Sequence, residues 1–164
     1  MNKINIKFAK VNPNAKIPSK RVEDAGFDIY ACFDEPNIIL EPHETKLIPT
    51  GIASSCSSDY CFVLKERGST GTKGIAQRCG IIDSGYRNEW FVPVTNTTDR
   101  LLVFYNNDAG LIKDAMAIQY PTSKAICQAL VVPVPDTEVE EISYEELKVI
   151  PSERGMGSRG SSGK

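Results

Sequence analysis

Short stretches in which apolar and polar residues alternate recur along most of this chain, about every eight to twelve residues. Successive side chains of a β-strand point to opposite faces of a sheet, so a period of two is typical of strands with one face in a core. Regularly spaced strands of this length predict an all-β fold, a sandwich or a barrel. The stretches span residues 4–8, 27–30, 38–40, 46–48, 60–64, 91–94, 101–105 and 130–134.

Helical patterning is confined to residues 143–147. Ser143 is followed three residues later by Glu146, which is the spacing of a capping box, where each side chain bonds the backbone N–H of the other residue. We therefore expect at most one short helix in the chain.

The composition changes after Pro151. Residues 152–164 are mostly glycine, serine and charged residues, and Met156 is their one apolar side chain. Such a segment buries too little apolar surface to offset the entropy lost on ordering. The sequence therefore predicts a single β domain over residues 1–151 and a C-terminal arm over residues 152–164 that a bound nucleotide would order.

Length, charge and cysteine content exclude several classes of protein. A chain of 164 residues can bury a core without cross-links. The five cysteines are odd in number, form no Cys-x-x-Cys pair and stand at no metal-ligand spacing from His43, which we interpret as a surface residue in a turn. These features favour a reducing cytoplasm. A net charge of −2 argues against nucleic-acid binding, and the alternating residues 1–7 predict neither a secretory signal nor a membrane span.

The stretch Gly80–Glu89 sets a carboxylate, an aromatic ring and a guanidinium between two β-rich runs. Two isoleucines lead into it, residues 90–94 lead out and Gly85 suits a turn, so the sequence predicts a β-hairpin with Asp83–Gly85 at its tip. A hairpin tip holds polar groups over a rigid base. An ordinary hairpin whose aspartate caps its own turn is the alternative.

Five short segments, spread over almost the whole chain, together resemble a known family. They are Ala25–Ala31, Arg67–Gly74, Gly80–Glu89, Ala125–Gln128 and Arg154–Gly163. In this order they are similar to the five motifs of the trimeric dUTP pyrophosphatase (dUTPase) family. The second segment is no Walker phosphate loop, because Lys73 is followed by glycine and isoleucine and a further β-like run.

The resemblance implies a distorted jelly-roll or β-clip barrel and a homotrimer whose active sites are shared between subunits, with the arm of one chain closing over the nucleotide. It implies hydrolysis of dUTP to dUMP and pyrophosphate by attack of water at the α-phosphorus, with Mg²⁺ on the triphosphate. Such an enzyme limits uracil in DNA and supplies dUMP for dTMP synthesis.

The third segment would supply the catalytic base and the base-recognition surface. By the resemblance, Asp83 orients and deprotonates the attacking water. Tyr86 packs beneath the deoxyribose and excludes a 2′-hydroxyl, while backbone groups around Gly80, Ile82 and Glu89 bind the uracil edge. An amphipathic core aromatic is the alternative at Tyr86.

The other segments would bind the metal and the phosphates. Asp28 would hold Mg²⁺ through water; an internal ion pair is the alternative, because a carboxylate inside an apolar strand is costly without a partner. Gln128 would order water and phosphate, unless it is a core glutamine satisfied by backbone groups. The remaining substrate-binding residues that the resemblance implies are Arg67, Gly68, Ser69, Arg154, Arg159, Gly160, Ser161 and Ser162.

The chain departs from the family pattern at three positions. Glu66 stands where a proline is usual, and Gly68 stands where a serine is usual, so a phosphate contact by a hydroxyl would come from Ser69 or Thr70. Arg159 stands where many members have a phenylalanine that covers the uracil. A guanidinium plane also stacks on bases, so we predict that Arg159 covers the uracil.

Two other functions compete with this interpretation. The dCTP deaminases of the same fold have a glutamate as proton shuttle where this chain has Pro93, which cannot move a proton. A non-catalytic dUTP-binding regulatory protein is the rival from another class. Residues 106–124 are where a regulatory role would be sought, because this stretch is longer than a hairpin link requires; an extra hairpin without function is the alternative.

Overall fold

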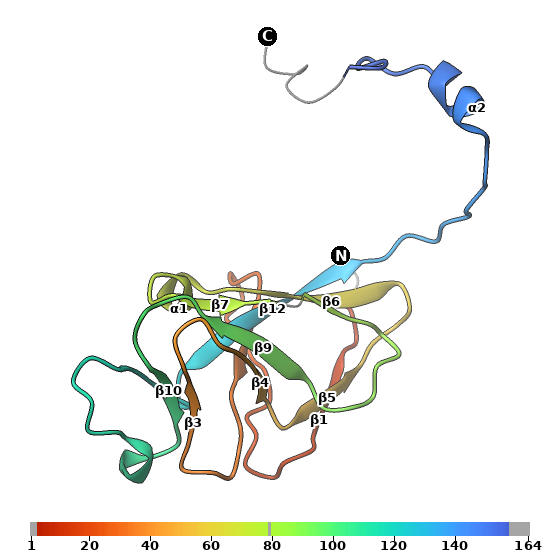
Figure 1. Ribbon diagram of the computed structural model, residues 1–164. Helices are drawn as coiled ribbons and strands as arrows, with labels where there is room; N and C mark the ends of the chain where they lie inside the picture. Colours follow the sequence, from red (N-terminus) through yellow and green to blue (C-terminus); the bar gives the residue numbers. More distant parts are fainter. Residues whose placement is uncertain (1–2, 79, 158–164) are drawn as a thin grey trace. The chain divides into compact units, whose positions relative to one another are not determined.

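The computed structural model describes residues 3–78 and 80–157. The chain divides into two compact units, Met1–Val134 and Pro135–Lys164. All strands among the described residues belong to the first unit (Figure 1). The arm predicted over residues 152–164 lies within the second unit, and its function as an arm stays a prediction.

The strands of the first unit form four small sheets (Figure 1). The sheets are β1 (Lys7–Lys10) with β5 (Ile52–Ser55); β11 (Ile118–Pro121), β10 (Leu102–Tyr105) and β3 (Asn37–Leu40); β2 (Phe27–Tyr30), β12 (Ala125–Pro133), β6 (Tyr60–Lys65) and β8 (Ile81–Ile82); and β4 (Thr45–Pro49), β9 (Phe91–Asn96) and β7 (Ile75–Gln77). Described strand pairs are antiparallel except β10 with β11. The all-β prediction is confirmed.

The sheets do not close into a barrel within the described residues, which corrects that part of the expectation. The physical reason is the shortness of the strands. Apart from β12, each has between two and six residues, so the ladders end before one sheet can join the next.

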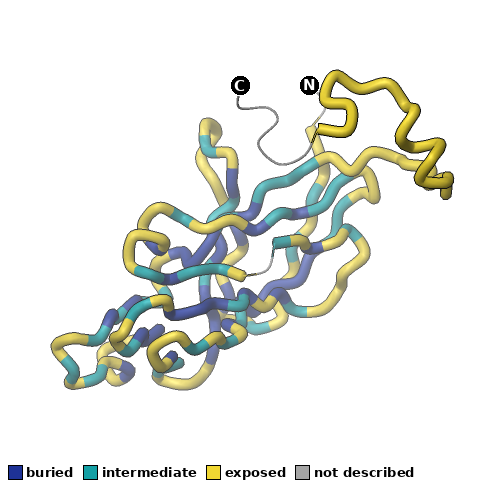
Figure 2. The backbone as a smooth tube through the Cα atoms, turned by 45° about the horizontal axis from the view of Figure 1, so that its top comes forward, coloured by how far each residue is buried: buried dark blue, intermediate teal, exposed yellow. Residues whose placement is uncertain are grey.

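Parts of β6 and β12 contribute alternate residues to the core of the first unit. Phe62 and Leu64 of β6 belong to it, as do Cys127 and Ala129 of β12, whereas the residues between them do not. The fully buried Trp90 packs with its ring centroid 5.0 Å from that of Phe62. Replacing a buried ring of this kind by alanine costs about 3–5 kcal/mol. Buried backbone gathers inside this unit (Figure 2), so the core ties together the sheets that carry the candidate site.

The helical content differs from the prediction. Helix α2 (Tyr144–Val149) is the expected one, and its capping box forms: the Ser143 Oγ accepts from the Glu146 N–H at 3.2 Å, and the Glu146 carboxylate accepts from the Ser143 N–H at 2.8 Å. The limit of one short helix is wrong, because α1 (Gly68–Gly71) and the 3₁₀ helix η1 (Asp108–Gly110) also form.

Helix α1 forms for a local reason. Thr70 is fully buried, and its Oγ1 both accepts from the Arg67 N–H at 3.2 Å and donates to the Arg67 carbonyl at 2.9 Å. These bonds close a single turn that the glycine-rich sequence does not reveal by hydrophobic periodicity.

The predicted hairpin around Asp83–Gly85 is also wrong. Strand β8 pairs with β6, whereas β9 pairs with β4 and β7, so residues 83–90 connect two different sheets. The turn itself forms, because the Tyr86 N–H donates to the Asp83 carbonyl at 3.1 Å. The Trp90 N–H then donates to the Ile52 carbonyl at 2.8 Å, which directs the chain toward β5 and away from β8.

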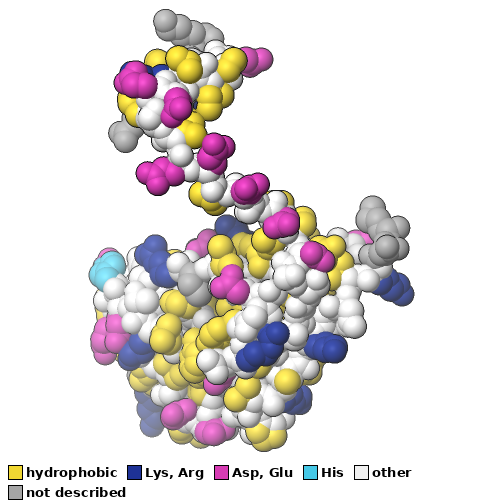
Figure 3. Space-filling view, turned by 90° about the vertical axis from the view of Figure 1, so that its right-hand side faces the viewer, with side chains coloured by type: hydrophobic (Ala, Val, Ile, Leu, Met, Phe, Trp, Pro, Cys, Tyr) yellow, Lys and Arg dark blue, Asp and Glu magenta, His cyan; other side chains and the backbone are white. Residues whose placement is uncertain are grey.

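The second unit is exposed along its described part, residues 135–157 (Figure 2). Acidic side chains follow one another along it, as the space-filling view shows (Figure 3). Among the described residues of the whole chain, we find no helix with the length and apolarity needed to cross a membrane.

Candidate functional site

Three of the predicted site residues, Asp28, Arg67 and Gln128, line one polar cleft of about 680 Å³. We call them the cleft group. They come from segments far apart in the sequence, and the register of the central sheet brings two of them together, since Asp28 of β2 pairs with Gln128 of β12. The other lining residues are Ser19, Lys20, Arg21, Glu23, Asp24, Ala25 and Gly26.

A side chain at Gly26 would press on Gln128 of β12. A Cβ at this position would lie 3.0 Å from the Gln128 Oε1 and 3.1 Å from its Cβ. The absence of a side chain therefore leaves Gln128 room to lie along the cleft wall. The Asp28 N–H donates to the Ser19 carbonyl at 2.9 Å and so attaches the loop before β2 to the strand.

Arg67 precedes α1 and faces Asp28. Its Nε lies 3.4 Å from the Asp28 Oδ1, and its Nη1 donates to the Ala125 carbonyl at 3.4 Å. Both side chains of the ion pair are about one third exposed (31% and 34%), so water screens it and it contributes at most about 1 kcal/mol. The ion-pair alternative for Asp28 thus exists in the structure, and its solvated position still lets the carboxylate meet a hydrated cation.

Gln128 is half-buried, and its Nε2 donates to the Glu66 carbonyl at 3.2 Å. The Glu66 carboxylate in turn accepts from the Gln77 N–H of β7 at 3.1 Å. The residue that replaces the usual proline therefore holds the segment before α1 against both Gln128 and a neighbouring sheet. Sequence reasoning assigned no role to Glu66, because its partners are distant in sequence.

Gly68 and Ser69 begin α1 and are exposed. A side chain at position 68 would meet no atom within 4 Å, so packing does not explain the glycine. Ser69 lies near Tyr120. The sequence analysis assigned no role to Tyr120. The Tyr120 hydroxyl donates to the Ala125 carbonyl at 2.8 Å, and burial raises the pKa of its phenol while a hydrogen bond with Ser69 opposes that shift.

Asp83 and Tyr86 lie together on the turn of residues 83–86, and we call them the turn group. The exposed Asp83 carboxylate makes no hydrogen bond or ion pair with a described residue, so it does not cap its own turn. Tyr86 is 37% exposed and its hydroxyl donates to the Glu89 carbonyl at 3.1 Å. It is therefore a surface residue and not part of the core.

The other three predicted residues of the third segment make structural contacts. The Gly80 carbonyl accepts from the Leu64 N–H at 2.6 Å, Ile82 is buried, and the Glu89 carboxylate accepts from the Gly51 N–H at 2.7 Å. In the described strand order β8 is an edge strand, so its outer edge carries N–H and C=O groups that can pair with another molecule.

The cleft group and the turn group do not share a cavity, since neither Asp83 nor Tyr86 lines the cleft. Arg154 belongs to the second unit, where its carbonyl accepts from the Gly157 N–H at 3.1 Å. The other predicted arm residues lie outside the described residues; they are Arg159, Gly160, Ser161 and Ser162.

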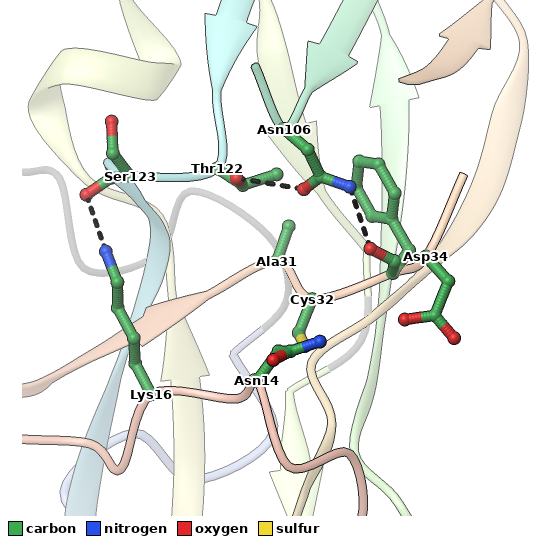
Figure 4. Close-up of a pocket in the computed structure, with 9 residues that line it drawn as sticks. Asn14, Lys16, Ala31, Cys32, Asp34, Asn106, Thr122 and Ser123 are labelled. Carbon is green, nitrogen blue, oxygen red and sulfur yellow. Dashed lines mark hydrogen bonds between the residues drawn. The ribbon is translucent and has the colours of Figure 1, made fainter. Parts of the chain in front are cut away.

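A second cleft of about 440 Å³ contains none of the predicted site residues (Figure 4). Lys16 lies across it and donates from Nζ to the Ser123 carbonyl at 3.2 Å. Asn106 accepts from the Thr122 hydroxyl at 3.1 Å and donates to the Phe33 carbonyl at 2.8 Å. These polar groups satisfy one another and brace the chain after β2.

Comparison with known proteins decides the family. The family model described as dUTPase matches residues 13–109, more than half of the chain. The chain belongs to the dUTPase family. The deoxyuridine 5'-triphosphate nucleotidohydrolase of Nautilia profundicola is 34% identical over 163 residues, which cover 97% of this chain and 99% of that protein. The enzyme of the same name from Leptospira interrogans is 36% identical over 94 residues, which cover 55% of this chain and 64% of the relative.

Solved structures of the dUTPase family show the same fold. The dUTPase of Staphylococcus bacteriophage 80alpha with dUpNHpp superposes with a TM-score of 0.74 at 23% identity, over 98% of this chain and 99% of that chain. The dUTPase of phage phi11 of S. aureus, described with a structural Mg(II) ion, gives a TM-score of 0.68 at 20% identity over 86% of this chain. This likeness confirms the jelly-roll prediction for the fold.

Proposed function

We propose that this chain hydrolyses dUTP to dUMP and pyrophosphate by attack of water at the α-phosphorus. The observation that carries the proposal is the match to a named dUTP nucleotidohydrolase over 97% of this chain and 99% of that relative. In a cell, the reaction limits uracil in DNA and supplies dUMP for dTMP synthesis.

Asp83 is the catalytic base of the proposed reaction. Its carboxylate is exposed and carries no hydrogen bond to a described residue, so both oxygens are available to orient a water and take its proton. General-base catalysis of this kind typically contributes about 10²–10⁴-fold to the rate.

Recognition of the base and sugar is assigned to the same segment. The backbone around Gly80, Ile82 and Glu89 lies before, on and after the edge strand β8, and a strand edge can pair with a uracil edge through its N–H and C=O groups. The ring of Tyr86 beneath the deoxyribose leaves no space for a 2′-hydroxyl. These two contacts favour dUTP over dTTP, dCTP and UTP.

The cleft group, with Gly68 and Ser69, binds the phosphates. Arg67 supplies a planar donor for phosphate oxygens, and Gln128 orders water and phosphate beside it. Asp28 would hold Mg²⁺ through water; among the described residues no three acidic, histidine or cysteine side chains gather around it. A single carboxylate fits this ion, because Mg²⁺ keeps several waters and takes oxygens from the substrate phosphates, whose negative charge it spreads.

The arm closes the site. Arg154 meets the γ-phosphate, Ser161 and Ser162 with the amide of Gly160 complete the phosphate contacts, and Arg159 covers the uracil. The arm extends over residues 152–164 beyond a domain of residues 1–151, and its closure excludes bulk water.

We assign the protein to a homotrimer with shared sites. Neither Asp83 nor Tyr86 lines the cleft that Asp28, Arg67 and Gln128 share, so we assign the turn group of each site to a second copy. We also assign the protein to the reducing cytoplasm, where the free thiols of Cys32, Cys56 and Cys61 persist.

The reaction is tested by measuring pyrophosphate release from dUTP with Mg²⁺, in parallel with dCTP, dTTP and UTP. We expect release from dUTP, with the other three nucleotides at least about a hundredfold slower. Equal rates would contradict the assigned recognition surface. Absence of release from all four would overturn the proposed function.

The shared site is tested by mixing two inactive variants. Asp83→Asn disables the turn group and Arg67→Met disables the cleft group. If each site combines residues of two copies, co-expressed chains regain activity, because some sites of a mixed trimer contain neither substitution. No recovery, with mixed assemblies shown by mass spectrometry, would mean that one chain supplies both groups.

A further inference from the structure

The guanidinium of Arg87 holds the turn group in place. Its Nη1 donates to the Ser84 carbonyl at 2.5 Å and approaches the Tyr86 carbonyl at 3.3 Å. Both carbonyls belong to the turn that the Tyr86 N–H closes onto Asp83. One side chain therefore binds the turn that carries the proposed catalytic base and the proposed sugar-binding ring.

The same Nη1 also lies 3.3 Å from the carbonyl of Ser54 in β5, a residue that is only 5% exposed. On this edge of β5, the Ile52 carbonyl already accepts from the Trp90 backbone at 2.8 Å. Two residues further along β5, Arg87 supplies from its side chain the donor that a neighbouring strand would supply. The Arg87 guanidinium thus takes the place of a backbone N–H at the Ser54 carbonyl, while the Trp90 N–H bonds the Ile52 carbonyl.

The exposed Arg87 side chain also borders a groove. It lines a groove of about 210 Å³ beside β1 and β5, together with Lys7, Phe8 and Ala53. No ion pair between Arg87 and a carboxylate occurs within residues 3–78 and 80–157, so its polar contacts there are to backbone carbonyls. This bonding pattern is that of a brace between a turn and a strand.

The exposed turn has few other attachments. Tyr86 bonds back to the Glu89 carbonyl, and Glu89 reaches the Gly51 N–H, but both contacts lie beyond the tip at Ser84 and Gly85. We propose that Arg87 is a positioning residue of the reaction, which sets the placement of Asp83 and Tyr86 by tying the turn to β5. This inference rests on the proposed function, because it assigns those two side chains their roles.

A displacement of about 1 Å in a reacting group can lower a rate about a hundredfold. Arg87→Ala should therefore lower kcat for dUTP by about a hundredfold and reduce the preference for dUTP over UTP by about tenfold, since Asp83 and Tyr86 both lose their placement. Arg87→Lys keeps the charge, but its ammonium group ends short of the Nη1 position that makes all three contacts, so it should recover only part of kcat. Arg100→Ala, which removes an exposed guanidinium from the β9–β10 connection, is the matched control and should behave like the wild type.

Hydrogen exchange gives a readout that does not depend on activity. Residues 83–90 should exchange at least about tenfold faster in Arg87→Ala, with the core strands and the melting temperature unchanged, because the turn opens locally. Unchanged exchange there would overturn the inference whether or not the wild type hydrolyses dUTP. A rise in KM alone, with kcat and selectivity intact, would also overturn it and make Arg87 a substrate contact. An inactive wild type with the expected exchange pattern would support the attachment of the turn by Arg87 and would refute the proposed function.

Discussion

The cleft group and the turn group are held by different kinds of contact. Asp28 and Gln128 sit opposite each other in a backbone ladder, above a core that contains Phe62 and Trp90. Asp83 and Tyr86 sit on an exposed connection between two sheets, held by one turn bond and a few side-chain contacts. Register in a sheet is specified by many bonds and by burial of alternate side chains, whereas a turn depends on each contact individually.

This difference predicts which substitutions change activity without changing the stability of the fold. Substitutions in the turn group should change catalysis without changing the fold, because their side chains face solvent. Substitutions behind the cleft should act through packing, because a side chain at position 26 would press on Gln128 across the sheet.

The largest effect is expected for Asp83→Asn, which keeps the shape of the side chain and removes the base. The variant should bind dUTP and lose about 10³-fold in kcat, with the melting temperature unchanged. Steady-state kinetics and equilibrium binding of dUTP check this. Normal turnover would show that another group activates the water and that Asp83 is not the catalytic base.

A smaller effect is expected for Gly26→Ala. The new Cβ would lie 3.0 Å from the Gln128 Oε1, so the glutamine has to move, and kcat/KM for dUTP should fall about tenfold with little loss of stability. Measuring Gly26→Ala again in a Gln128→Ala background sharpens the test. The 3.1 Å contact with the Cβ at position 128 remains in that background, so an alanine that acts by displacing the Gln128 amide should lose most of its effect there. A full tenfold loss in both backgrounds would place its effect elsewhere.

The smallest effect is expected for Gly68→Ser, which restores the residue usual in the family. A side chain at position 68 meets no atom within 4 Å, so we expect unchanged stability and a KM for dUTP that is equal or lower by up to about threefold, in line with one hydrogen bond to phosphate. A higher KM would show that the phosphates need bare backbone at this position.

Local patterns could be predicted where neighbouring residues decide them. The capping box of Ser143 and Glu146 formed as expected, because both partners lie within one turn of helix. The hairpin at Asp83–Gly85 did not form, because the choice of partner for β8 and β9 depends on strands distant in sequence. Strand β5 was missed for a related reason: Ile52, Ala53 and Ser54 are all buried, so no alternation marks the strand.

The sequence by itself determined the chemistry that the molecule can offer. The five segments place a carboxylate, a ring, arginines and a glutamine in the order of the dUTPase family, and this order does not depend on the fold being known. Side-chain type and short-range spacing are local properties, so they can be interpreted without tertiary structure.

Only the tertiary structure decided which groups meet. The antiparallel register sets Gln128 opposite Asp28 across a separation of one hundred residues and brings Arg67 within 3.4 Å of that carboxylate. It also leaves Asp83 and Tyr86 outside that cleft and gives Arg87 a partner in β5. These outcomes depend on burial and on backbone hydrogen bonds between strands that are distant in sequence. Such contacts form together when the core packs, so no single stretch of sequence reveals them.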